Sequence, residues 1–200
     1  MRGFPRHPSP SNEGEGRNAR PVPARSKLDS GFIMSILLLV TGGTFDKEYH
    51  ELSGELDFRD THVPKMLELG RCRLDVVVRT AMLIDSLDMT EGDRQFLLAH
   101  IRREDERQIV ITHGTDTMVE TARVLAEGLH GSDKAVVLTG AMVPFAFGSS
   151  DGLFNLGSAL SFVQLLPPGV YVAMNGRWFP WDNVRKNREL GVFEGVRSPA

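Results

Sequence analysis

Two short segments rich in threonine and glycine contain the side chains best suited to chemistry. Thr41-Gly42-Gly43-Thr44 and Thr115-Asp116-Thr117 each follow an apolar run. The two glycines allow the backbone to approach a ligand closely and to turn its N–H groups toward it. Thr44 is therefore placed as a nucleophile or as a hydrogen-bond donor. Glycine-rich turns after a first strand also bind phosphates, so the first segment alone favours neither chemistry.

The acidic residue of the second segment narrows the choice. Either Asp116 or Thr117 can cap a following helix, or Asp116 can be a carboxylate held beside hydroxyl groups at a ligand crevice. A carboxylate in the crevice repels a phosphate and suits a cationic amino group. The chain also contains no Gly-Lys-Ser/Thr phosphate loop and no complete Gly-x-Gly-x-x-Gly fingerprint, which lowers the weight of a nucleotide site.

Apolar runs alternate with helical patterns, and this alternation predicts the elements that position the two segments. Strands are expected at 36–40, 74–79, 108–112, 135–139 and 170–174, the second extending less distinctly to 84. Helices are expected at 62–70, from the cap Thr90 to 103, after Thr117 to about 126 with Gly128 as a stop, and at 153–165. The pattern predicts an α/β fold with a doubly wound, mostly parallel sheet in three layers, of the Rossmann or flavodoxin kind.

Polar turns follow four of these predicted strands, at Thr41, Thr112, Thr139 and Asn175. In an open α/β sheet the carboxyl ends of the parallel strands form the ligand crevice. We therefore expect the reactive groups to gather at one edge of one sheet.

The composition indicates an ordinary globular protein. Of the 200 residues, 41% are hydrophobic and 24% are charged, which suits one domain with a buried core. A net charge of −3 gives no electrostatic reason to expect a nucleic acid or an anionic membrane as a partner, and no apolar run is long enough to predict a transmembrane helix. Cys72, the single cysteine, cannot form an internal disulfide, which favours a cytoplasmic location.

The first 33 residues differ from the rest of the chain. They contain five of the eleven prolines and have almost no apolar pattern, so we expect a disordered extension at 1–33 and a single catalytic-type domain at 34–200. A secretory signal peptide is the less favoured interpretation, because cleavage near Thr41 would remove the first strand. Met34 is instead a candidate for the true start of translation.

The motifs together resemble those of the bacterial-type L-asparaginases. The resemblance is carried by Thr41-Gly42-Gly43-Thr44, His113-Gly114-Thr115-Asp116-Thr117 and Gly140-Ala141-Met142-x-Pro144, followed by Ser150-Asp151-Gly152. The stretch from Val172 to Lys186 is similar to the later family segment that holds a catalytic lysine. The resemblance covers most of residues 34–190 and implies the fold of the family's N-terminal catalytic domain.

The resemblance also implies the roles of individual residues. Thr44 matches the threonine that attacks the side-chain amide carbon of asparagine, giving an acyl-enzyme that water hydrolyses to acid and ammonia. Thr115, Asp116 and Lys186 match the group that positions or activates the nucleophile or the water. A threonine hydroxyl needs such a partner at neutral pH. A surface lysine remains the alternative interpretation of Lys186. Tyr49 resembles the family's tyrosine on a mobile lid.

Further residues match the part of the family site that binds the substrate. The backbone N–H groups of Gly43 and Thr115 match the oxyanion hole, and the substrate-binding set comprises Gly43, Ser86, Asp88, Gly114 and Ala141. The side chains supply the nucleophile and its activators, so no metal and no organic cofactor are expected. The expected partners are a small amide substrate and other copies of the chain, as a dimer or tetramer, because one domain alone would leave an open crevice.

Three departures from the family pattern concern substrate recognition. The spacing from Thr44 to Tyr49 is shorter than the usual hinge, and Leu87 stands where many members have a glutamine that helps to hold the α-amino group. The second domain of typical asparaginases is also expected to be absent. The amide-cleaving residues are thus all matched, whereas the residues that recognise free asparagine are fewer.

Two other functions remain open from the sequence. A non-catalytic sensor of amino acids or amides can use the same fold, although a binder has no need of two threonines and a lysine. A nucleotide- or phosphate-binding α/β protein is the third alternative. Ammonia release separates the enzyme from the sensor, and tight binding of ATP or NAD would favour the third.

Overall fold

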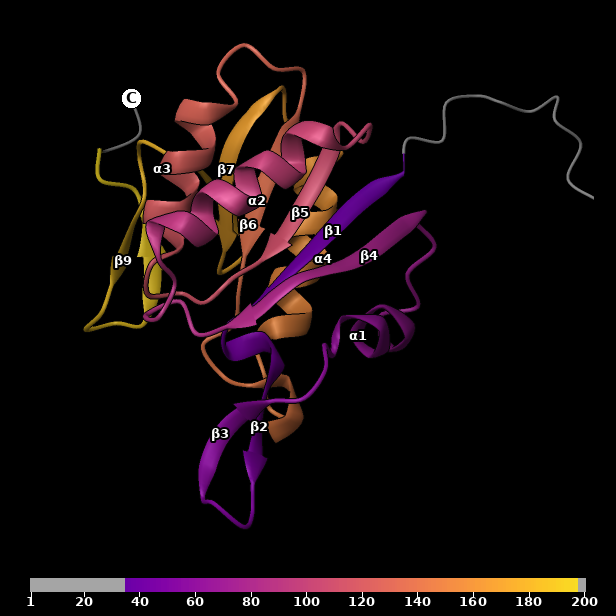
Figure 1. The fold of residues 1–200 in the computed structure, drawn as a ribbon, viewed down its shortest axis with the longest axis vertical. Helices are drawn as coiled ribbons and strands as arrows, with labels where there is room; N and C mark the ends of the chain where they lie inside the picture. The colour runs from indigo at the N-terminus through magenta and orange to yellow at the C-terminus, as the bar shows by residue number, and fades with distance from the viewer. Residues whose placement is uncertain (1–34, 198–200) are drawn as a thin grey trace, which may run out of the picture. The chain divides into compact units, whose positions relative to one another are not determined.

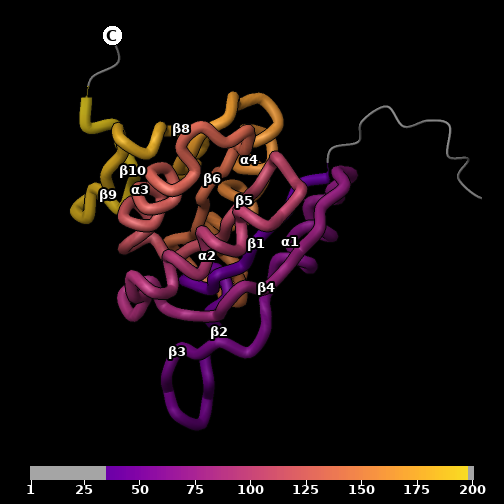
Figure 2. Tube along the Cα trace, turned by 45° about the horizontal axis from the view of Figure 1, so that its top comes forward, coloured from indigo at the N-terminus to yellow at the C-terminus, as the bar shows by residue number. Residues whose placement is uncertain are grey.

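The computed structural model describes residues 35–197, so the predicted extension at 1–33 lies outside the described residues. Five parallel strands form most of one sheet: β1 (Ile36–Gly42), β4 (Val76–Ile84), β5 (Gln108–Thr112), β6 (Ala135–Thr139) and β7 (Gly169–Met174). A sixth strand, β8 (Arg177–Pro180), pairs antiparallel with β7 at one edge. The order is β4-β1-β5-β6-β7-β8; Figure 1 labels the first five of these strands, and Figure 2 labels β8. Because β4 and β5 flank β1, the winding direction changes between β1 and β5, which is where such sheets bind ligands.

Helices cover both faces of this sheet. α2 (Glu91–Arg103) and α3 (Met118–Gly128) lie on one face, and α1 (Val63–Leu69) and α4 (Gly152–Val163) lie on the other (Figure 1). The predicted doubly wound, mostly parallel sheet in three layers is therefore confirmed. Within residues 35–197, no helix is long and apolar enough to span a membrane.

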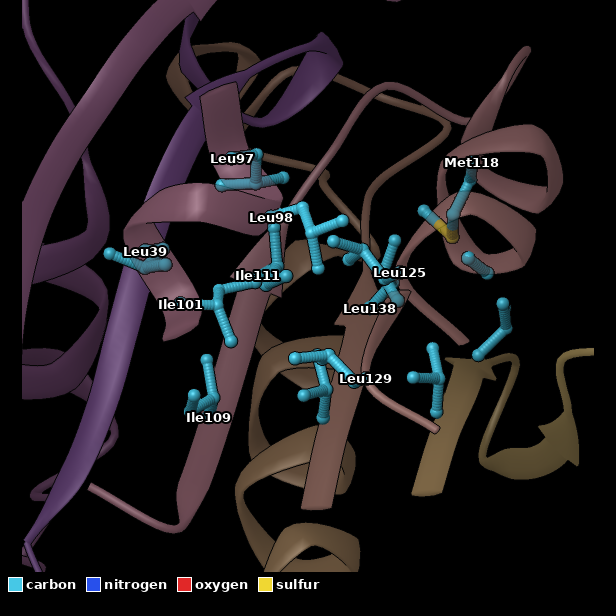
Figure 3. Close-up of a cluster of buried hydrophobic side chains, with 14 of the residues drawn as sticks. Leu39, Leu97, Leu98, Ile101, Ile109, Ile111, Met118, Leu125, Leu129 and Leu138 are labelled. Carbon is cyan, nitrogen blue, oxygen red and sulfur yellow. The ribbon is translucent and has the colours of Figure 1, made fainter. Parts of the chain in front are cut away.

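The side chains of β1 show how the apolar run builds the two cores. Leu37 and Leu39 belong to the core under α2 and α3, whereas Leu38 and Val40 belong to the core under α1 and α4. Figure 3 shows the first of these cores, in which Leu39 faces the α2 side chain of Ile101. A strand that is buried on both faces has to be apolar at every position, and this explains the uninterrupted run in the sequence.

A local signal in the sequence sets the start of α2, whereas α1, α3 and α4 begin without a side-chain cap hydrogen bond. The Thr90 side chain accepts a hydrogen bond from the N–H of Asp93, so Thr90 caps α2 as expected; the Asp93 carboxylate also accepts one from the N–H of Thr90, which completes a capping box. Gly128 does not stop α3 but is its last residue. A Cβ at Gly128 would overlap the Leu98 side chain, so this glycine allows α2 and α3 to approach closely.

Five short strands were not predicted from the sequence. They are β2 (Lys47–His50), β3 (Glu55–Phe58), β8, β9 (Arg185–Asn187) and β10 (Val192–Glu194). β2 pairs with β3, and β9 pairs with β10, as two separate antiparallel hairpins. The β2–β3 hairpin follows the end of β1 and projects from the sheet edge in both views (Figures 1 and 2). These strands have only three or four residues each, which leaves too little alternation to reveal them.

Candidate active site

The turn after β1 packs directly on the turn after β5. Gly43 has a positive φ of 76°, and a Cβ at this position would lie only 2.5 Å from the Cα of Gly114. Glycine is therefore required here both for the backbone conformation and for the close approach. This contact places Thr44, the next residue, beside the turn that carries Thr115.

Two more strand ends join the same crevice. Gly114 lies against the Ser86 side chain, after β4, and Thr117 Oγ1 donates a hydrogen bond to the Ser86 carbonyl at 2.7 Å. Gly140, after β6, packs so closely that a Cβ there would be 3.2 Å from Thr115 Cγ2. The polar turns after β1, β4, β5 and β6 are thus brought together at the carboxyl edge of the sheet.

Three predicted residues form the centre of this edge, and we call Thr115, Asp116 and Lys186 the lysine cluster. Lys186 Nζ donates to Thr115 Oγ1 at 2.8 Å and to Asp116 Oδ1 at 2.9 Å. The Lys186 side chain is only 13% exposed, so the surface-lysine interpretation is wrong. Asp116 does not cap α3, because its carboxylate faces Lys186. Thr117 is the N-cap residue, although its hydroxyl bonds to Ser86 instead of capping the helix.

Thr44 begins a short 3-10 helix, η1 (Thr44–Asp46), directly after the two glycines. The residue is half-buried, and its hydroxyl makes no hydrogen bond to another residue in 35–197. Asp46, two residues after Thr44, is buried, and its Oδ1 accepts hydrogen bonds from the His62 N–H at 2.8 Å and from Thr61 Oγ1 at 3.0 Å. Burial raises the pKa of Asp46, and its partners at the start of α1 fix the chain that leaves Thr44.

The other predicted site residues differ in their surroundings. Ser86 is buried, and its hydroxyl has no hydrogen-bond partner in the described part of the chain. Ala141 is also buried, with its methyl group in the core under α1 and α4. Asp88 is exposed, and Tyr49 lies on β2 with 57% exposure. The structure therefore brings Gly43, Gly114 and Ser86 to the lysine cluster, while roles for Tyr49, Asp88 and Ala141 stay predictions.

An ion pair that the sequence did not reveal closes the base of the β2–β3 hairpin. Lys47 Nζ donates to Asp85 Oδ2, and Asp85 Oδ1 accepts the N–H of Leu87 at 2.9 Å. Burial alone would raise the pKa of Asp85, but the hydrogen bonds from Lys47 and from the Leu87 N–H, together with the Lys47 charge, outweigh it and lower the pKa. The pair connects the residues that follow Thr44 with the turn that carries Ser86.

His113 supports the backbone of the lysine cluster from beneath. It is fully buried, with Nδ1 2.8 Å from the Gly114 carbonyl and Nε2 2.8 Å from Thr121 Oγ1. Burial lowers its pKa to about 4, so the ring is neutral at pH 7. Since the carbonyl can only accept, the proton is assigned to Nδ1, and Nε2 accepts from Thr121, which in turn accepts from Arg94 Nε at 3.1 Å.

This arrangement orients one peptide group at the crevice. The Gly114 carbonyl points toward His113, and in a trans peptide the N–H of the next residue points the opposite way. The N–H of Thr115 is therefore turned away from His113. No group of three His, Cys, Asp or Glu residues within 35–197 is placed to hold a metal ion.

The fold and the crevice define an α/β protein whose site lies at the β1/β5 switch point, and comparisons with known proteins agree. The family model described as Asparaginase, N-terminal matches residues 35–199. The chain therefore belongs to the asparaginase family.

The relatives agree in both sequence and structure. L-asparaginase 1 of Escherichia coli K12 is 32% identical over 178 residues, which are 82% of this chain and 51% of that protein. L-asparaginase of Thermococcus kodakarensis is 39% identical over 174 residues, 83% of this chain and 52% of that protein. Its solved structure gives a TM-score of 0.73 at 30% identity, covering 83% of this chain and 52% of that one. The chain thus spans about half the length of these relatives.

Proposed function

We propose that the chain is an asparaginase-type amidohydrolase with Thr44 as its nucleophile. The reaction converts the side-chain amide of L-asparagine, or a related small carboxamide, to the carboxylic acid and ammonia with consumption of one water. The observation that carries the proposal is the position of Lys186, whose Nζ lies between Thr115 Oγ1 and Asp116 Oδ1 at the crevice.

The proposed reaction has two halves. In the first, Thr44 Oγ1 attacks the amide carbon and loses its proton, the C–N bond breaks, and the nitrogen leaves as ammonia after gaining a proton. In the second, water attacks the resulting ester, the carbon–Oγ1 bond breaks, and Thr44 recovers its proton. Thr115, held by Lys186, is the hydroxyl that orients the water or passes the proton between these groups.

Charge that develops on the amide oxygen needs hydrogen-bond donors that are already in place. The N–H groups of Gly43 and Thr115 are proposed for this role. The orientation of the Gly114–Thr115 peptide by His113 supports the assignment, because a fixed donor requires no reorganisation when the charge forms.

Substrate recognition is proposed for polar groups around the lysine cluster. The Asp116 carboxylate can pair with an α-ammonium group, and the Ser86 hydroxyl, which lacks a partner within residues 35–197, can bond to the substrate. Tyr49 and Asp88 would approach the substrate from the exposed side. The exposed Leu87 offers no polar group, so we expect weaker selection for a free α-amino acid than a polar residue at this position would give.

We further propose that the active form is a homo-oligomer, a dimer or a tetramer, in the cytoplasm. Tyr49 and Asp88 are exposed in the single chain, whereas amide hydrolysis benefits from a site that is shielded from bulk water. The location follows the Campylobacter jejuni relative, named a probable cytoplasmic L-asparaginase, whose structure gives a TM-score of 0.66 at 31% identity over 80% of this chain and 51% of that one. Light scattering that showed a fully active monomer would contradict the oligomer.

Ammonia release from asparagine, glutamine and a panel of small amides tests the proposal. The wild type should release ammonia from at least one amide, and Thr44→Ala should abolish it. Thr80→Ala, on the exposed part of edge strand β4, is the matched control and should keep the activity. Full activity in Thr44→Ala would exclude the threonine nucleophile. Saturable amide binding without ammonia release in any oligomeric state would favour a sensor.

A further inference from the structure

We propose that Asn155 and Asn175 are positioning residues that hold Lys186 in place, an inference that rests on the proposed function. Lys186 lies on β9, which belongs to the separate β9–β10 hairpin and has no strand partner in the main sheet. Its contact with Thr115 therefore needs a connection from the main sheet to that hairpin. The side chains of two asparagines, the buried Asn155 and the exposed Asn175, provide this connection.

Asn175 holds the hairpin from the end of β7. It has a positive φ of 56°, and its Oδ1 accepts the N–H of Phe193 at 2.9 Å. Phe193 is the residue directly opposite Lys186 in the β9–β10 pairing, and its ring is buried in the core under α2 and α3. The Asn175 side chain thus fixes the strand position that faces Lys186.

Asn155, on α4, holds Asn175 in turn. Its buried side chain accepts the Asn175 N–H on Oδ1 at 3.1 Å, while Nδ2 donates to the Gly140 carbonyl at 2.9 Å and to Asp151 Oδ2 at 2.8 Å. A backbone N–H needs an acceptor and a carbonyl needs a donor, so these partners fix the orientation of the amide. Asn155 therefore ties the end of β6 to the end of β7.

The same connection reaches the other half of the lysine cluster. Gly140, whose carbonyl Asn155 binds, lies against the turn after β5, where an added Cβ would come within 2.5 Å of the His113 carbonyl oxygen and 3.2 Å of Thr115 Cγ2. One end of the network thus reaches the turn that carries Thr115, and the other end holds the partner strand of Lys186. The 2.8 Å contact between Lys186 Nζ and Thr115 Oγ1 is set from both sides. A misplacement of about 1 Å in such a contact can cost about 100-fold in rate.

Asn175→Gly is the decisive variant, because glycine tolerates the positive φ but removes the acceptor of the Phe193 N–H. We expect kcat to fall about 10- to 100-fold with little change in KM, as for a displaced catalytic group. Asn175→Asp keeps an acceptor oxygen and should restore most of the activity. In a Lys186→Ala background, Asn175→Gly should have no further effect on the residual rate.

A role in folding alone predicts a different pattern. In that case Asn175→Gly would lower Tm without a selective loss of kcat. It would also lower the residual rate of the Lys186→Ala variant by the same factor as it lowers the wild-type rate. Either result would overturn the inference. If the Asn155→Ala variant folds, it should reproduce the Asn175→Gly phenotype. If it does not fold, the comparison of Asn175→Gly with Asn175→Asp still tests the inference.

A second readout is independent of turnover. Acetylation of lysines by acetic anhydride, followed by mass spectrometry, reports how freely Lys186 Nζ moves, with Lys65 at 57% side-chain exposure as the internal reference. Asn175→Gly should raise the Lys186 rate several-fold relative to Lys65, and Asn175→Asp should not. An unchanged rate in Asn175→Gly would overturn the inference. If the wild type releases no ammonia but Lys186 is still acetylated faster in Asn175→Gly than in the wild type, the proposed function is refuted and the positioning role stands.

Discussion

The two sides of the crevice are held in different ways. On one side, the lysine cluster is bonded internally and supported by His113 from below. On the other side, the Thr44 hydroxyl makes no bond to the described residues, and the β2–β3 hairpin that follows it carries the exposed Tyr49. The groups proposed to activate Thr44 or the water are thus held in place by the main sheet and the β9–β10 hairpin. The groups proposed to cover the substrate are not held in this way.

The difference has a structural origin. Thr115 and Asp116 lie in the turn after β5, and Lys186 reaches them from the β9–β10 hairpin, whose Phe193 side chain is buried in the core under α2 and α3. The β2–β3 hairpin has no strand partner in the main sheet, and it is attached at its base by the Lys47–Asp85 pair and by His62 Nε2, 2.9 Å from Glu48 Oε1. We infer that substrate or a neighbouring copy orders the covering side, while the activating side is preorganised.

The largest expected effect comes from removing the lysine. Lys186→Ala should lower kcat by about 100- to 10,000-fold, because the loss of a proton-transfer partner has this size. Lys65→Ala, an exposed lysine on α1, is the matched control and should retain full ammonia release. A Lys186→Ala enzyme within about twofold of the wild type would mean that the lysine cluster is structural.

The support beneath the cluster should weaken in acid. His113 is neutral in the fold, with its pKa lowered from 6.5 to about 4, so its contribution to stability is complete above pH 6.5 and is lost as the pH falls toward 4. This shift corresponds to about 3 kcal/mol in the free energy of unfolding. Urea unfolding at several pH values should therefore show a steep decline in this window.

The control for this prediction is the difference between the wild type and His113→Gln. The raised pKa of Asp46 acts in the opposite direction, since protonation relieves the cost of burying its charge, and the subtraction removes that contribution. The difference should shrink as the pH falls from 6.5 to 4. A pH-independent difference would show that His113 does not titrate as described.

Substitution of Tyr49 on the β2–β3 hairpin should lower the activity and leave the stability of the protein unchanged. Tyr49→Ala should lower kcat/KM about 10-fold while changing the free energy of unfolding by less than about 0.5 kcal/mol, because the side chain is exposed in the free protein. Leu52→Ala, at the exposed tip of the same hairpin, is the control and should leave both quantities unchanged. A loss of stability in Tyr49→Ala would contradict the distinction between the two sides.

The smallest expected effect concerns the cation outside the cluster. Arg188 lies 3.6 Å from Asp116 Oδ1, but its side chain is 69% exposed and water screens the pair. Arg188→Ala should change kcat and KM by less than about twofold, since exposed ion pairs contribute little. A tenfold rise in KM would instead identify Arg188 as a substrate contact.

Much of the fold could be predicted because its strands are buried on both faces. The runs at 108–112 and 135–139 match β5 and β6 at both ends. The second strand begins at Val76 and not at 74, and the helices differ from expectation by one or two residues at most of their ends. The polar hairpins were missed because three- and four-residue strands have no readable periodicity.

The sequence predicted which residues make up the candidate site, but not the residues that hold them in position. Family motifs identified Thr115, Asp116 and Lys186, and the structure adds that Lys186 reaches them from a hairpin outside the sheet. That geometry depends on Asn155, which gave no signal because one asparagine in an apolar helix resembles an ordinary surface residue. The burial of His113 is likewise a property of packing, which spacing in a sequence does not reveal.

Trapping the acyl group tests whether Thr44 is the nucleophile. The enzyme is mixed with its best amide substrate in the presence of hydroxylamine, which intercepts an ester, and a second sample is quenched with acid for mass spectrometry of the peptide that contains Thr44. We predict hydroxamate formation together with the acyl mass on Thr44, and neither in Thr44→Ala. Turnover without hydroxamate and with unmodified Thr44 at saturating substrate, or an acyl group on another residue such as Thr115, would contradict the account.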